Sequence, residues 1–114
     1  MKINYNDKHF RGVLNTANGQ VSGLTLFHYR QDGDLLWGTY KGGNIRMGTL
    51  TGLVWEDGRL SFHYQHVDSG NTIRIGRCES QPEYLSDGRL RLHESWSWLN
   101  GDRTSGTSIV EEDR

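Results

Sequence analysis

The sequence predicts a single all-β domain, residues 1–114, built as an antiparallel up-and-down β-barrel of about eight to ten strands. Three observations support this prediction. The chain has 15 glycines and a single proline, and many of the glycines stand in dipeptides that suit tight hairpin turns. No segment repeats its apolar residues with the 3.6-residue period of an amphipathic helix. The aromatic residues, three Phe, five Tyr and four Trp, fall mostly on one face of the predicted sheet.

Seven dipeptides divide the chain at regular intervals, and each suits a two-residue turn that requires a positive φ. They are Asn18-Gly19, Asp32-Gly33, Gly42-Gly43, Asp57-Gly58, Ser69-Gly70, Asp87-Gly88 and Asn100-Gly101. Seven turns imply eight strands. A further hairpin would precede them if Asn6-Asp7 joined residues 2–5 to residues 9–16, and the count would then reach nine or ten.

A two-residue turn fixes which residues face each other, so the predicted turns carry one face from strand to strand. The first hairpin places Phe10 opposite Phe27 and Leu14 opposite Gly23, and the second places Phe27 opposite Gly38. The inner face built in this way contains Leu36, Tyr40, Ile45, Met47, Thr49, Thr51, Leu53, Trp55, Leu60, Phe62, Tyr64, His66, Ile73, Ile75, Arg77, Glu79, Leu92, Glu94, Trp96, Trp98, Thr107 and Ile109. A sheet with one aromatic face must curl over that face, and eight strands then close around side chains or one small ligand. Pro82 is the point at which a bulge could shift this register.

Glu94 is the polar exception in the segment "LRLHESWSWL", where it shares the predicted inner face with leucines and tryptophans. A buried charge needs partners, because desolvating it alone costs several kcal/mol. In one interpretation Arg77 bridges Glu79 and Glu94 as a structural ion pair. In the other, which is compatible with the first, the inner face binds a small polar or amphipathic ligand. The candidate ligand-binding residues are Arg77, Glu94, Glu79, Tyr64, His66, Tyr29, Tyr40 and Trp96.

The predicted outer face is mostly polar but carries one apolar set on its second to fourth strands. This set comprises Leu24, Leu26, Leu35, Trp37, Leu50 and Val54. Either the N-terminal segment covers it with Ile3 and Tyr5, or it forms a homodimer surface through Leu24, Leu26, Trp37 and Leu50.

Composition excludes several classes of partner. With 13 basic and 14 acidic side chains the net charge is −1, which argues against nonspecific attraction to nucleic acid or to anionic lipid. No run of about 18 apolar residues suits a membrane span, and no apolar leader follows Met1. The lone cysteine, Cys78, can form no internal disulfide, which is typical of a reducing compartment. We therefore expect a cytoplasmic protein.

No catalytic motif stands out, and an enzyme is not the favoured hypothesis. His63 and His66 are three residues apart on a strand, so they point to opposite faces and cannot share a metal ion. A haem or metal site on His66 or His28 remains as an alternative. The chain contains no Gly-x-Ser-x-Gly elbow, phosphate-binding loop or dinucleotide fingerprint. We expect no catalytic residues, metal or cofactor.

Four strings, "HFRGVLNTANGQVSG", "FHYRQDGDLLWGTYKGG", "YQHV" and "DGRLRLHESW", resemble a group of short uncharacterised bacterial proteins. The resemblance runs over nearly the whole chain and implies a lipocalin- or avidin-like barrel. Some members carry the automatic label N-acetylglutamate synthase, so an acyltransferase is a further alternative. Acetyltransferases hold acetyl-CoA with an Arg/Gln-x-x-Gly-x-Gly/Ala loop that opens a helix. The nearest string here, "RMGTLTG", misses that spacing and lies in a predicted strand.

Overall fold

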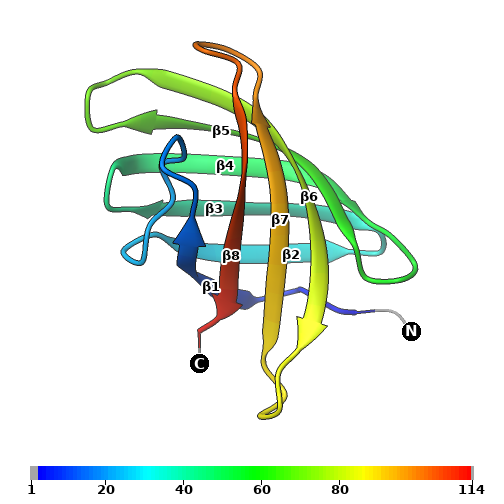
Figure 1. Ribbon diagram of the computed structural model, residues 1–114. Coiled ribbons are helices and arrows are strands. Elements are labelled where there is room, and N and C mark those ends of the chain that lie inside the picture. The colour runs from blue at the N-terminus through cyan, green and yellow to red at the C-terminus, as the bar shows by residue number, and fades with distance from the viewer. Residues whose placement is uncertain (1–2, 114) are drawn as a thin grey trace.

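The computed structural model describes residues 3–113 and confirms the predicted fold class. Its eight antiparallel strands pair in chain order, and β8 pairs with β1 to close the barrel (Figure 1). The strands are β1 (Lys8–Asn15), β2 (Leu26–Asp32), β3 (Leu35–Gly42), β4 (Ile45–Val54), β5 (Leu60–Asp68), β6 (Ile73–Tyr84), β7 (Leu90–Trp98) and β8 (Ser105–Glu112). Residues 3–5 form no strand, so the count is eight; Lys2 of the proposed extra hairpin lies outside the described residues. Nowhere in residues 3–113 is there a helix long and apolar enough to cross a membrane.

The first two hairpins keep the predicted inner face except at Leu14, which is 64% exposed because the register of β1 shifts between Gly12 and Leu14. Phe10 pairs with Phe27 as expected, although the connection between β1 and β2 is a long loop over residues 16–25 rather than a tight turn. The turn between β2 and β3 consists of Gly33 and Asp34, one residue later than predicted. Phe27 therefore faces Tyr40 instead of Gly38, a shift of two residues that leaves the same side chains inside.

A β-bulge between Tyr40 and Gly42 shifts β4 by an odd number of residues, which exchanges its two faces relative to the prediction. Leu50 and Val54, predicted on the outside, therefore point into the barrel. A second bulge between Ile45 and Met47 keeps Ile45 buried. The residues of this stretch that were wrongly predicted to face inward are Met47, Thr49, Thr51, Leu53 and Trp55.

Connections longer than two residues exchange the faces of β6 and β8 in the same way. The loop between β5 and β6 covers residues 69–72, so Gly76, Cys78 and Ser80 face inward. The loop between β7 and β8 covers residues 99–104 and brings Ser108 and Val110 inside. Six residues predicted on the inner face are therefore outside: Ile73, Ile75, Arg77, Glu79, Thr107 and Ile109.

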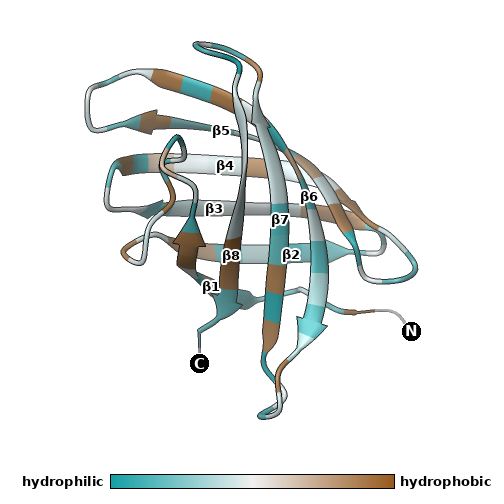
Figure 2. Cartoon of the chain, viewed as in Figure 1, coloured by the Kyte–Doolittle hydropathy of each residue, from teal (hydrophilic) through white to brown (hydrophobic). Residues whose placement is uncertain are grey.

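Strand β7 shows the predicted alternation without change. Leu90, Leu92, Glu94, Trp96 and Trp98 are all buried, and the bands of hydrophobic and hydrophilic residues along this strand are visible in Figure 2. The carboxylate of Glu94 therefore does lie inside the barrel, as the strand period predicts.

The N-terminal segment closes one end of the barrel instead of covering the outer apolar set. Ile3 and Tyr5 are buried, and the Tyr5 ring lies 6.4 Å from Phe10 and 6.3 Å from Tyr29 between ring centroids. The Tyr5 hydroxyl donates a 2.6 Å hydrogen bond to the carbonyl of Gly58 in the loop between β4 and β5. This end of the lumen is thus filled by the chain itself.

Two glycines let tyrosine rings lie flat on the inside of the wall. A Cβ atom at Gly48 would collide with the ring of Tyr40, and one at Gly76 would collide with the ring of Tyr64. Because neither glycine has a side chain, both rings rest on the backbone of the neighbouring strand. The tyrosines thereby become part of the inner wall at the other end of the barrel.

Candidate functional site

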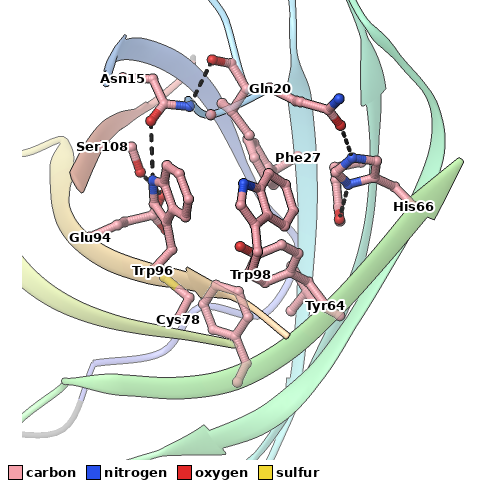
Figure 3. Close-up of a pocket in the computed structure, with 15 residues that line it drawn as sticks. Asn15, Gln20, Phe27, Tyr64, His66, Cys78, Glu94, Trp96, Trp98 and Ser108 are labelled. Atoms are coloured by element: carbon pink, nitrogen blue, oxygen red, sulfur yellow. Dashed lines mark hydrogen bonds between the residues drawn. The ribbon is translucent and has the colours of Figure 1, made fainter. Parts of the chain in front are cut away.

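A cavity of about 40 Å³ lies in the lumen at the end opposite Tyr5, beneath the loop of residues 16–25. Its wall residues come from all eight strands and from the loop, and Figure 3 draws them as sticks. They are Asn15, Gly19, Gln20, Val21, Phe27, Tyr40, Leu50, Phe62, Tyr64, His66, Cys78, Glu94, Trp96, Trp98 and Ser108. A cavity of this size holds a few water molecules, whereas sites for larger organic ligands usually measure some hundreds of Å³. The lumen is therefore largely filled while the loop lies over it.

Aromatic side chains form a nearly continuous wall around the cavity. Phe27 stacks on Tyr40 at 5.1 Å between ring centroids, and the edge of Tyr64 meets Trp98 at 5.8 Å. Trp96 and Trp98 lie 5.2 Å apart. The π faces and edges of these rings offer apolar contact area together with a negative electrostatic face.

The carboxylate of Glu94 forms part of the cavity wall. It accepts hydrogen bonds from the Ser108 hydroxyl at 2.9 Å and from the Ser80 hydroxyl at 3.2 Å, and the thiol of Cys78 lies beside it. Burial raises the pKa of Glu94 because desolvation penalises the charged form, and the two hydroxyls partly oppose that shift. Glu94 is therefore held by neutral donors.

The predicted ion pair of Glu94 with Arg77 and Glu79 is wrong. Arg77 and Glu79 lie on the outside of β6, where Glu79 accepts a hydrogen bond from Ser61. The cause is the loop of residues 69–72, which shifts β6 by one residue relative to β5 and turns both side chains to the other face. Cys78 and Ser80 take their places inside the barrel.

His66 connects the cavity to the covering loop through an oriented chain of hydrogen bonds. The Tyr40 hydroxyl and His66 Nδ1 are 2.8 Å apart, and His66 Nε2 lies 2.6 Å from Gln20 Oε1. The Gln20 carbonyl oxygen can only accept, so Nε2 carries the proton and Nδ1 accepts from Tyr40. Burial lowers the pKa of His66 to about 4, which keeps the ring neutral. The Gln20 amide then donates to Asp68 at 3.0 Å.

Side chains tether the loop to the barrel at several further points. The Asn15 amide donates to the carbonyl of Val21 at 3.1 Å while its oxygen accepts from Trp96 Nε1. Trp98 Nε1 donates to the carbonyl of Asn18 at 3.1 Å. The Asn18 amide also donates to the carbonyl of Ser105 at 2.9 Å, and Arg11 donates to the carbonyl of Gly23 at 3.2 Å. We call residues 16–25 the lid, because these side-chain contacts hold them across the mouth of the cavity.

Five of the eight predicted ligand-binding residues line the cavity: Tyr40, Tyr64, His66, Glu94 and Trp96. Tyr29 is buried deeper, beside Phe10, and no residue from 3 to 113 offers its hydroxyl a hydrogen-bond partner. Sequence reasoning missed Asn15, Gln20, Cys78, Ser80 and Ser108. The alternation on β6 and β8 contained the signal for the last three, but it could be read only with the correct loop lengths.

The histidine alternative for a metal or haem gains no support from the geometry. His28 lies on the outer surface, where its ring stacks on His9 and Nε2 lies 2.7 Å from the carboxylate of Asp7. Within residues 3–113, no three His, Cys, Asp or Glu side chains come together in a way that could hold a metal ion. His66 is already bonded at both ring nitrogens.

The placement of Glu94 predicts how stability depends on pH. A raised pKa means that the folded protein binds this proton more tightly than the unfolded chain does, so stability falls as pH rises through the folded-state pKa. Replacing Glu94 by Gln removes that loss. The free energy of unfolding of Glu94→Gln relative to wild type should therefore grow with pH, by about 1.4 kcal/mol for each unit by which the pKa is raised.

Urea denaturation at several pH values between about 5 and 8 measures this difference. His66 has a lowered pKa and adds stability as pH rises, but it does so in both proteins and cancels in the comparison. The matched control is Glu79→Gln on the outer surface, which makes the same chemical change and leaves Glu94 in place. A difference for Glu94→Gln that grows with pH no more than that of the control would mean that the Glu94 carboxylate is not desolvated.

Comparison with known protein families matches residues 3–113 to the family described as avidin-like protein. No curated protein and no solved structure shows significant similarity to the chain. The match spans nearly the whole sequence and agrees with the closed eight-stranded barrel. The chain therefore belongs to the avidin-like family.

Proposed function

We propose that this barrel binds a small organic molecule in its lumen, at the end covered by the lid. The observation that carries the proposal is the cavity itself, in which aromatic walls converge with Glu94 on one side and the neutral His66 on the other. Apolar walls with a few placed polar groups are the usual anatomy of small-molecule sites. Avidin-like barrels are a family of small-molecule binders, with biotin as the associated ligand, which supports the same conclusion.

Any ligand larger than a few water molecules requires the lid to move. No backbone hydrogen bond joins residues 17–24 to a strand of the described barrel, and side chains provide the tethers. Such side-chain hydrogen bonds contribute about 0.5–1.5 kcal/mol each, so a ligand that replaces them can open the site at moderate cost.

The buried lone cysteine is compatible with the proposed cytoplasmic location.

A substitution that fills the cavity tests lumen binding. Leu50 is 2% exposed and lines the cavity, whereas Leu53 on the same strand is 42% exposed on the outer face. Leu50→Phe should abolish ligand binding by occupying the space, and Leu53→Phe should leave it intact. Ligand-observed NMR with biotin and with pooled bacterial metabolites, followed by melting curves with each hit, measures binding.

The tryptophans provide a second readout for the same titrations. Trp96 and Trp98 line the cavity, while Trp37 and Trp55 are exposed on the outside. In a Trp37→Phe/Trp55→Phe background the fluorescence therefore reports on the lumen alone. Hits that bind Leu50→Phe as well as they bind the Leu53→Phe control would place the site elsewhere on the protein.

A homodimer through the outer apolar surface is a second candidate function. The set of residues that forms this surface differs from the predicted set. Leu24 is 71% exposed, and Leu26, Leu35 and Trp37 are also exposed on the outside of β2 and β3 or next to them. Leu50, which was predicted in this set, is buried in the lumen instead. Exposed apolar clusters commonly mark protein contacts, and avidin-like proteins often form oligomers.

The dimer proposal is tested by Trp37→Glu, which places a charge in the outer apolar set. Sedimentation should show a dimer for the wild type and a monomer for the variant, with unchanged β-sheet circular dichroism. The matched control is Trp55→Glu at another exposed position. A monomeric wild type at high protein concentration would remove this proposal and leave lumen binding untouched.

A further inference from the structure

Glu94 and Glu112 are both strongly buried glutamates, but only Glu112 is paired with a positive charge among the described residues. Glu112 lies at the Tyr5 end and pairs with the Lys8 ammonium at 3.2 Å. Glu94 is 7% exposed, and among residues 3–113 no Lys, Arg or His lies within ion-pair distance of its carboxylate. Its hydrogen-bond donors are two serine hydroxyls. An ionised carboxylate in this position lacks the opposite charge that buried charges ordinarily have.

The other titratable groups that face Glu94 cannot provide that charge. They are Tyr29 of β2, Tyr40 of β3, Tyr64 of β5 and Cys78 of β6, all of which are neutral acids. Burial raises the pKa of each, and the carboxylate of Glu94 raises it further. These groups around Glu94 are therefore neutral, and among residues 3–113 no cation is paired with its carboxylate.

The aromatic wall of the cavity also favours a positively charged group. Rings attract a cation over their faces, most strongly for Trp, and the attraction grows when the site excludes water. Trp98 already makes one cation–π contact, because the guanidinium carbon of Arg74 lies 4.0 Å from its ring centroid. The cavity presents six such rings, from Phe27, Tyr40, Phe62, Tyr64, Trp96 and Trp98, together with one carboxylate.

We propose that the lumen ligand is a small organic cation, an amine or a quaternary ammonium, whose charge lies against Glu94 within the aromatic wall. This inference rests on the proposed function and narrows its ligand class. An anionic head group would meet the Glu94 charge in a poorly solvated site, and a neutral one would leave that charge uncompensated. The cavity accommodates only the cationic head, so the rest of the ligand extends past the displaced Gln20.

Pairs of ligands that differ in charge but hardly in shape test the proposal. Choline is compared with 3,3-dimethylbutan-1-ol, and benzylamine with benzyl alcohol, in the Trp37→Phe/Trp55→Phe background by fluorescence titration. Each cation should bind at least about tenfold more tightly than its neutral counterpart, as expected from a desolvated cation–π contact with a paired carboxylate. Benzoate and biotin serve as anionic probes and should bind more weakly than the cations.

Glu94→Gln then assigns the preference to one residue. Its amide oxygen can accept from one of the two serine hydroxyls and its NH2 group can donate to the other, so the charge is removed while both hydroxyls keep a partner. The tenfold preference should therefore vanish while the neutral compounds keep their affinity. Glu79→Gln is the matched control and should retain the preference. Choline cannot titrate, so its affinity should weaken as pH falls through the pKa of Glu94 in wild type and stay constant in Glu94→Gln.

The outcomes separate this inference from the proposed function. If the neutral or anionic compounds bind the lumen as tightly as the cations, in wild type and in Glu94→Gln alike, the cationic class is overturned and lumen binding stands. If cations bind but Leu50→Phe does not weaken them, they bind elsewhere and the inference also fails. If neither these compounds nor the metabolite pool perturbs Trp96 and Trp98, the proposed function itself fails.

Discussion

Closure of the sheet is the constraint on which the rest of this structure depends. Once β8 pairs with β1, every second side chain of eight strands must enter one narrow lumen. The two ends of the lumen differ. The Tyr5 end is filled by the N-terminal segment and by large side chains such as Phe10 and Tyr29. The other end has small residues at Gly48, Gly76, Ser80 and Ser108, and the cavity lies there.

The lid and the aromatic wall form one connected polar and aromatic system. His66 is bonded to Tyr40 inside the barrel and to Gln20 in the lid, while Asn15 links Trp96 to the backbone at Val21. A molecule that enters the cavity must therefore exchange hydrogen bonds with the same groups that hold the lid. This coupling explains how a lumen with so little free volume can still be a binding site, because the lid contacts supply polar partners that a ligand can take over.

The sequence predicted the strands well and their faces unevenly, and the reason is physical. On β7 the alternation of leucine, glutamate and tryptophan placed Glu94 inside correctly, because it depends on nothing beyond the strand itself. On β6 the same reasoning placed Arg77 and Glu79 inside, because it assumed a two-residue turn where residues 69–72 form the loop. The apolar and small residues of β6, Gly76, Cys78 and Ser80, are themselves consistent with the inner face. Loop length, and with it the partner of Glu94, could not be predicted from glycine dipeptides alone.

If the lumen is a binding site that ligands reach by movement of the lid, the reactivity of the lone cysteine should report that movement directly. Cys78 is buried at the cavity wall, so a small thiol reagent such as methyl methanethiosulfonate can label it only when the cavity opens. The labelling rate under native conditions should rise in Gln20→Ala, which cuts the tether to His66 and Asp68, and should stay unchanged in Gln65→Ala on the outer surface. Equal rates in all three proteins, tracking global unfolding in denaturant, would mean that the lid does not open separately from the barrel.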